Sequence, residues 1–182
     1  MYLRPLAAID APALLDLRTR NQHFFERWEP AHSARHFTLP GQRDEIFHSI
    51  GDAEQDTRYA FGVFLLSDDE LIGRVALSNV SRGAWQSATL GYYIDEAHTG
   101  RGFATEAVLL AVQFAFEQIG LHRVQAAVLP RNVASRRVLE KAGFHREGHS
   151  TRYLQINGVW EDHEMFAITA EDWPGIDPGP RP

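Results

Sequence analysis

The sequence predicts an α+β fold with a mostly antiparallel, mixed sheet and one central β-α-β unit. The central unit is indicated by a β-rich run at 85–95, a glycine loop, an apolar helix at 105–119 and a second β-rich run at 123–129. A crossover of this length predicts that the two runs pair in parallel. Two further pairs of runs predict antiparallel hairpins, and Asn157-Gly158 in the second favours a type I′ turn.

The segments before this unit predict an edge strand and two helices. Residues 2–6 form the strand, and Pro5 favours an edge position because it cannot donate to a ladder. Asp10 is a suitable N-cap for the first helix, with Pro12 in its first turn. Residues 38–41 predict a break in the chain, and residues 42–50 predict a second amphipathic helix.

The hairpins and the last helix follow from turn and cap residues. An acidic turn at 67–70 separates the runs of the first hairpin, 59–66 and 71–79. The second hairpin is predicted over 152–168, after a helix that Asn132 begins as N-cap. The prediction is therefore a single domain over residues 1–173, followed by a flexible Pro/Gly-rich tail at 174–182.

Composition narrows the class of protein. The 182 residues are 44% hydrophobic and 23% charged, which is ordinary for a globular domain, and the net charge of −6 argues against direct nucleic-acid binding. The absence of cysteine excludes disulfides, thiolate metal sites and a cysteine nucleophile, and fits a cytoplasmic location. No apolar run approaches the roughly 20 residues of a membrane span, so no membrane partner is expected.

The glycine loop is the first chemical signal. Gly100 and Gly102 lie between a strand and a helix, where backbone N–H groups and the helix dipole favour a phosphate. No third glycine and no Gly-Lys-Ser/Thr follows, so dinucleotide and P-loop sites are poorly supported. A glycine-rich lead-in without any ligand remains the alternative on this pattern alone.

Two motifs resemble a known family. The run 99–104, Thr-Gly-Arg-Gly-Phe-Ala, resembles the acetyl-CoA loop of the GNAT N-acetyltransferases, although Thr99 stands where Gln or Arg is usual. Asn132-x-x-Ser135, followed by residues 138–144, also resembles this superfamily. Residues 20–30, 78–80, 90–92 and 153–163 are similar to its RimJ/RimL group, and residues 157–163 with Asp172-Trp173 favour the RimJ branch, the ribosomal-protein alanine N-acetyltransferases.

The resemblance implies an acyltransferase that moves acetyl directly from acetyl-CoA to a primary amine, first among these the N-terminal α-amine of a protein such as a ribosomal protein. It also implies that the pantetheine lies between two splayed strands, ending near Asp95 and Leu129, and that a strand N–H near Tyr93 stabilises the oxyanion. The residues expected to bind the donor are Tyr93, Ile94, Thr99, Gly100, Arg101, Gly102, Phe103, Ala104, Thr105, Asn132 and Ser135.

The reaction also requires proton transfers and an acceptor pocket. Ser135 is the predicted general acid, with a purely local helix-start role as its alternative. Candidate bases are Glu29, Asp162 and His163, and an acceptor wall is expected from Phe25, Trp28 and Glu29, unless these aromatics only pack in the core. The nine histidines show no metal-ligand spacing, so no metal is expected.

Two rival functions remain on the sequence alone. An acetyltransferase of a small amine, antibiotic or aminoacyl nucleotide would share the chemistry but have a different pocket. A non-catalytic acyl-CoA-binding module would bind acetyl-CoA without turnover, and the departure at Thr99 leaves room for it. Either a monomer or a homodimer is compatible with the sequence.

Overall fold

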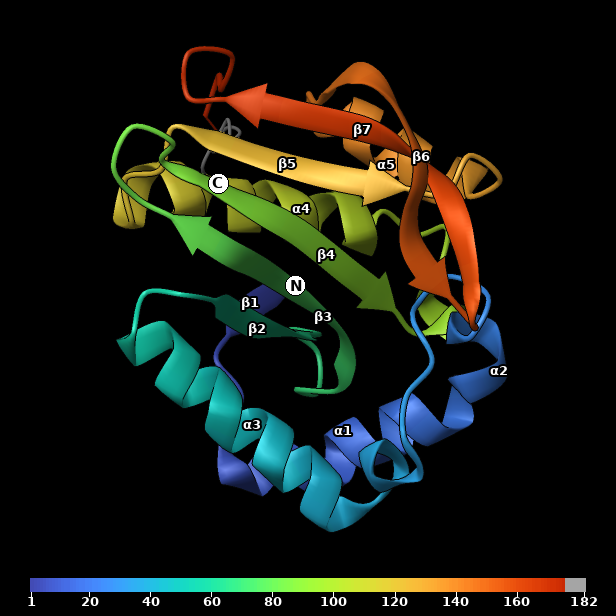
Figure 1. Cartoon of the computed structure of the whole chain (residues 1–182). Coiled ribbons are helices and arrows are strands. Elements are labelled where there is room, and N and C mark those ends of the chain that lie inside the picture. Colours follow the sequence, from blue (N-terminus) through green and yellow to red (C-terminus); the bar gives the residue numbers. More distant parts are fainter. Residues whose placement is uncertain (176–182) are drawn as a thin grey trace.

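The computed structural model describes residues 1–175 and places seven strands in one sheet of order β1-β2-β3-β4-β5-β7-β6 (Figure 1). The strands are β1 (Tyr2–Arg4), β2 (Tyr59–Phe64), β3 (Leu71–Ser81), β4 (Ser87–Ile94), β5 (Arg123–Val128), β6 (His145–Ile156) and β7 (Val159–Thr169). The helices are α1 (Ala11–Arg20), α2 (Gln22–Phe25), α3 (Leu39–Glu54), α4 (Phe103–Gln113) and α5 (Val133–Lys141). Of the predicted tail, 176–182 lie outside the described residues.

Short helical segments complete the chain. The 3₁₀ turns are Ala8–Asp10, Ala34–Phe37 and Glu96–His98, and α4 continues as a π-helical segment, Phe114–Gln118. Within residues 1–175 no helix combines the length and the apolar character that crossing a bilayer requires.

The α+β class and the central β-α-β unit are confirmed, because β4 and β5 pair in parallel across α4 while the other strand pairs are antiparallel. Asn157 and Gly158 both have positive φ, +46° and +81°, as a type I′ turn requires. Strand β6 begins at His145, seven residues before the predicted start. Most of its side chains are exposed, so it carries no apolar alternation, and pairing with β7 forms it.

One local prediction is wrong, and a second is correct only in the position of the residue. Residues 38–41 do not break the chain: Thr38 is the N-cap of α3, and its Oγ1 accepts a hydrogen bond from the Gly41 amide at 3.2 Å. Pro40 is tolerated because the first turn of a helix needs no N–H from it. Asp10 occupies the predicted N-cap position of α1, but its carboxylate makes no cap hydrogen bond: it accepts from the Ala7 amide and pairs with Arg4.

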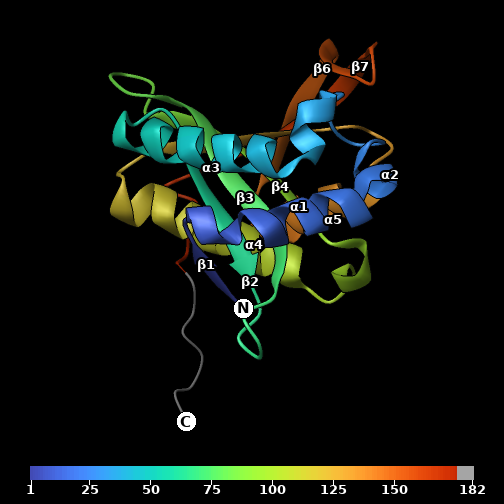
Figure 2. The same ribbon diagram turned by 90° about the horizontal axis from the view of Figure 1, so that it is seen from below.

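Helices cover both faces of the sheet (Figures 1 and 2). Along β2, Val63 packs in the cluster that contains α4, whereas its neighbour Phe64 packs with α1 on the opposite face, as the period of a strand requires. Helix α4 has fully buried residues, including Val108 and Val112, because the sheet and α5 enclose it. This burial fixes the start of α4 against the end of β4.

The sheet opens between β4 and β5. Their parallel pairing covers residues 87–89 of β4 and 123–125 of β5. Beyond that point β4 continues on β3 as far as Ile94, while β5 continues on β7 as far as Val128. The predicted splayed pair is therefore confirmed. The facing backbone edges of the two strands are left for other partners.

Candidate active site

A tight loop connects the end of β4 to α4. Gly100 and Gly102 have φ of +75° and +90°, which L-residues rarely adopt, and Gly102 is the N-cap of α4. A Cβ placed at either glycine would meet no heavy atom within 4 Å, so open space lies beside the loop. The first amides of α4 have no helical partner and are placed to bind an anionic group there.

Thr99 uses its hydroxyl within the loop. Its Oγ1 donates to the Glu96 carbonyl at 2.8 Å and closes the preceding 3₁₀ turn. The Thr99 side chain, which replaces the usual Gln or Arg, thus stabilises the local turn. The open loop and its backbone amides are kept, so the residues present fit a CoA pyrophosphate.

The loop forms one side of a cavity of about 370 Å³ that extends along the end of β4 to α5. We call this the donor cavity. Every residue expected to bind the donor lines it except Arg101, which is exposed. The expected acceptor wall also lines the donor cavity, through Phe25, Trp28 and Glu29. This first helical region therefore contributes to the donor side as well.

A second cavity, of about 340 Å³, opens along β3, β4 and β5, and we call it the acceptor cavity. His163 of β7 and Leu154 of β6 are part of its wall. Six residues line both cavities: Trp28, Glu29, Tyr92, Tyr93, Asn132 and Ser135. Two ligands, one in each cavity, would therefore meet beside the strand end of β4 and the first turn of α5.

Ser135 lies at this meeting point. Its Oγ is 2.8 Å from the Tyr92 hydroxyl, which also donates to the Ser135 carbonyl at 3.2 Å. Its amide donates to Oδ1 of Asn132 at 3.1 Å, so the predicted N-cap is confirmed. Burial raises the pKa of Tyr92 to about 12, although the hydrogen bond with Ser135 opposes the increase. The phenol therefore stays protonated at neutral pH.

Tyr92 was not among the residues predicted from the sequence. Tyr92 and Tyr93 are adjacent on β4 and must face opposite sides of the sheet, but the sequence does not say which faces α5. Tyr93 packs on Phe25, with ring centroids 4.8 Å apart, and beneath the Arg18 guanidinium. Only the placement of α5 assigns the other tyrosine to Ser135.

Glu29 is held as an ion. Both of its oxygens bond the buried Arg18 guanidinium, and His32 Nε2 lies 3.4 Å away. Burial alone would raise the pKa of Glu29, but the hydrogen bonds from His32 and Arg18 outweigh it and lower the pKa below its usual value. A carboxylate in this state is a weak base and a good partner for an ammonium group.

The structure separates the other two candidate bases. His163 is 3% exposed and lines the acceptor cavity, and its Nδ1 is 3.0 Å from the Glu161 carbonyl. Because a carbonyl oxygen only accepts, Nδ1 carries the hydrogen, and the neutral ring then has its lone pair on Nε2. Asp162 lines neither cavity: its side chain is 44% exposed, bonds His149 and accepts from the Arg152 amide.

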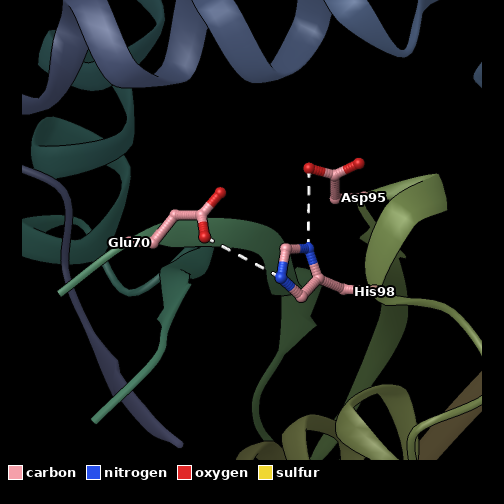
Figure 3. Close-up of side chains that lie close together, drawn as sticks. All are labelled: Glu70, Asp95 and His98. Atoms are coloured by element: carbon pink, nitrogen blue, oxygen red, sulfur yellow. Dashed lines mark ion pairs between the residues drawn. The ribbon is translucent and has the colours of Figure 1, made fainter. Parts of the chain in front are cut away.

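One cluster beside the loop combines a histidine with two acids (Figure 3). His98 lies between Asp95 and Glu70, with N–O distances of 3.7 and 3.8 Å. The Arg20 guanidinium bonds the same carboxylates, at 2.6 Å to Asp95 and 3.5 Å to Glu70. Because a fixed cation already sits on both acids, we interpret the cluster as an ion-pair network that anchors the end of β4.

The fold and the paired cavities define an acyl-group transferase of the GNAT type, and comparison with known proteins shows the same. The acetyltransferase (GNAT) domain family matches residues 1–145. The chain therefore belongs to this family, and it is an acetyl-CoA-dependent N-acetyltransferase.

Individual relatives agree with this assignment. The chain is 48% identical over 172 residues to the "Probable N-acetyltransferase YjcK" of Bacillus subtilis, covering 94% of this chain and 95% of that protein. It is 35% identical over 169 residues to the ribosomal protein uS5 alanine N-acetyltransferase of Escherichia coli, covering 90% and 84%. The structure of Mycobacterium smegmatis RimJ in complex with CoA-disulfide superposes with a TM-score of 0.90 at 35% identity, covering 94% and 83%.

Proposed function

We propose that this enzyme acetylates the N-terminal α-amine of a protein, in the first place a ribosomal protein. The observation that carries the proposal is the meeting of the two cavities at Tyr92, Tyr93 and Ser135, which allows a donor and an acceptor to react directly. The names of the relatives, RimJ and a ribosomal-protein alanine N-acetyltransferase, support the choice of acceptor. A ribosomal-protein acceptor also implies the cytoplasm as the location.

The rim of the acceptor cavity supports a polypeptide acceptor. Leu154 lines the cavity and is 40% exposed, and Val159 and Trp160, 60% and 59% exposed, follow at the end of the same hairpin. The Asn157 side chain donates to the Glu26 carbonyl and ties this hairpin to the chain after α2. Exposed apolar side chains beside a cavity are typical of a surface that receives a peptide.

Proton transfer is assigned to two residues that line the acceptor cavity, His163 and Ser135. His163 accepts a proton from the acceptor ammonium at Nε2, directly or through water, and the amine then attacks the acetyl carbonyl carbon. A backbone N–H of β4 near Tyr93 stabilises the charge on the carbonyl oxygen. As the carbon–sulfur bond breaks, Ser135 Oγ, held by Tyr92, gives its proton to the leaving sulfur and takes up, directly or through water, the second proton that the new amide nitrogen loses.

Glu29 has a binding role in this proposal. Its ionised carboxylate, fixed by Arg18, attracts the acceptor ammonium into the acceptor cavity before His163 removes a proton. Acetyl-CoA, held by the amides from Thr99 to Ala104, supplies the acetyl group. No covalent enzyme intermediate is required.

The test is thiol release from acetyl-CoA in the presence of a short peptide that begins with Ala. The chain contains no cysteine, so a thiol reagent reports only free CoA. The same peptide with a blocked α-amine is the control, and a panel of small amines is the comparison. Release with the free peptide and acetyl on its α-nitrogen by mass spectrometry are expected. Release with small amines alone would contradict the proposal.

A further inference from the structure

Two arginines form part of the wall of the acceptor cavity. Arg74 lies on β3 directly opposite Tyr93 of β4, and Arg58 immediately precedes β2. The Arg74 side chain is 9% exposed and that of Arg58 is 27% exposed, which is unusual for arginine. None of the proton transfers described above uses either guanidinium.

The two arginines share one hydrogen-bonded carboxylate. Both bond the same oxygen of Glu45, Oε1, at 2.7 Å from Arg74 and 3.1 Å from Arg58. The next carboxylate is Asp52, 3.8 Å from Arg58, and the remaining partner of Arg74 is the Ser49 hydroxyl at 3.2 Å. Among the residues that the structure describes, the buried Nε atoms of both arginines have no hydrogen-bond partner.

One ion pair outside the cavities, Arg123 with Glu147, has a different form. The Arg123 side chain is 23% exposed, similar to the 27% of Arg58. Its two terminal nitrogens bond the two separate oxygens of Glu147. That pair is one cation to one carboxylate and lines neither cavity. At the acceptor cavity, two cations hydrogen-bond one oxygen of Glu45. The wall therefore places two guanidinium groups, with one hydrogen-bonded carboxylate between them, beside the space for the acceptor.

We propose that Arg58 and Arg74 bind a carboxylate on the acceptor, in one of the three residues that follow the reactive amine. The inference rests on the proposed function and specifies its substrate as a peptide with an acidic side chain near its N-terminus. Guanidinium groups match carboxylates in planar, bidentate geometry.

The distance to the reacting atoms sets the position of the acid. Neighbouring strands lie about 4.8 Å apart, so Arg74 is one strand away from Tyr93 and the meeting point of the cavities. An extended peptide advances about 3.3 Å per residue, so the next few side chains come within reach of the arginines. An acid much further along would lie outside the cavity.

The experiment compares peptides that begin with Ala and carry Glu or Gln at the second, third or fourth position. With the wild-type enzyme, kcat/KM is expected to be at least about tenfold higher for one Glu peptide than for its Gln partner. In Arg58→Gln this ratio is expected to fall to about one. Arg123→Gln is the matched control and should keep the wild-type ratio.

The variants are chosen so that misfolding does not hide the result. Arg74→Met alone would remove one of the two positive charges that balance the Glu45 carboxylate, so it is combined with Glu45→Gln in a double variant. Arg58→Gln is a separate single variant that tests the site independently. Equal rates for Glu and Gln peptides at all three positions would overturn the arginine subsite and leave the proposed function standing. An unchanged ratio in both Arg58→Gln and the double variant would also overturn it.

Small amines separate the failure of this inference from that of the proposed function. β-Alanine and propylamine differ in one carboxylate. Turnover of β-alanine in preference to propylamine, without turnover of any peptide, would refute the protein acceptor but support the arginine subsite. Equal rates for the Glu and Gln peptides, together with equal rates for β-alanine and propylamine, would refute the subsite.

Discussion

The substitution Ser135→Ala separates a catalytic from a structural role at the junction of the two cavities. It removes Oγ, which lies 2.8 Å from the Tyr92 hydroxyl, but keeps the backbone carbonyl that lies 3.2 Å from the same hydroxyl. The Tyr92 O–H can therefore still donate. The loss of folding stability is expected to stay within one net hydrogen bond, about 0.5–1.5 kcal/mol.

The effect on turnover should be much larger. General acid catalysis contributes about 10²–10⁴-fold, which corresponds to about 2.7–5.4 kcal/mol of activation free energy. We therefore expect kcat to fall by at least about a hundredfold. The KM for acetyl-CoA should change little, because Ser135 Oγ acts at the sulfur and the loop amides hold the pyrophosphate.

The assay is thiol release at saturating acetyl-CoA and Ala-peptide, together with thermal unfolding of each variant. Ser67→Ala, in the exposed turn between β2 and β3, is the matched control and should leave both quantities unchanged. Tyr92→Phe should also lower kcat, and the double variant should be no slower than Ser135→Ala, because the two hydroxyls act as a unit. Turnover of Ser135→Ala within twofold of wild type, with an unchanged unfolding midpoint, would refute the general-acid role.

Three further predictions concern the cofactor loop, the base and the half-buried His36. Gly102→Ala forces an L-residue to a φ of +90°, which costs about 1–2 kcal/mol, and calorimetry should show acetyl-CoA binding weakened by about tenfold. The control is Gly51→Ala in α3, and an equally small effect of both substitutions would contradict the prediction. His163→Asn should lower kcat by about 10²-fold or more, whereas His149→Asn at the surface should not; wild-type turnover in His163→Asn would exclude His163 as the base. Burial, with the charges of His32 and Arg18, lowers the pKa of His36 to about 4, so the unfolded state binds more protons and stability is lost as pH falls from about 6.5 towards 4. His36→Phe should flatten the fall in urea midpoint over that range, and an unchanged slope would show that other groups cause it.

Local sequence patterns were sufficient where local physics decides the structure. The glycine loop before α4 needs positive φ at Gly100 and Gly102, the turn between β6 and β7 needs it at Asn157 and Gly158, and the residue types state both requirements. The apolar character of α4 likewise predicted a helix enclosed on all sides. Sequence patterns were less reliable where two local signals oppose each other. At Thr38 the cap hydrogen bond favours a helix and Pro40-Gly41 favours a break, and the helix formed.

The sequence by itself determined the central β-α-β unit, the cofactor loop with its family, and the short list that contained Ser135, Glu29 and His163. Only the tertiary structure decided that the pairing of β4 with β5 ends after residue 89. Beyond that residue β4 stays paired with β3 and β5 stays paired with β7, and these pairings are not visible in the local sequence. It also decided that Tyr92 faces Ser135, and that Arg74 and Arg58 share one oxygen of Glu45. These contacts join residues 13 to 43 positions apart, and the hydrogen bonds and charges that fix them arise only when the separate elements pack together.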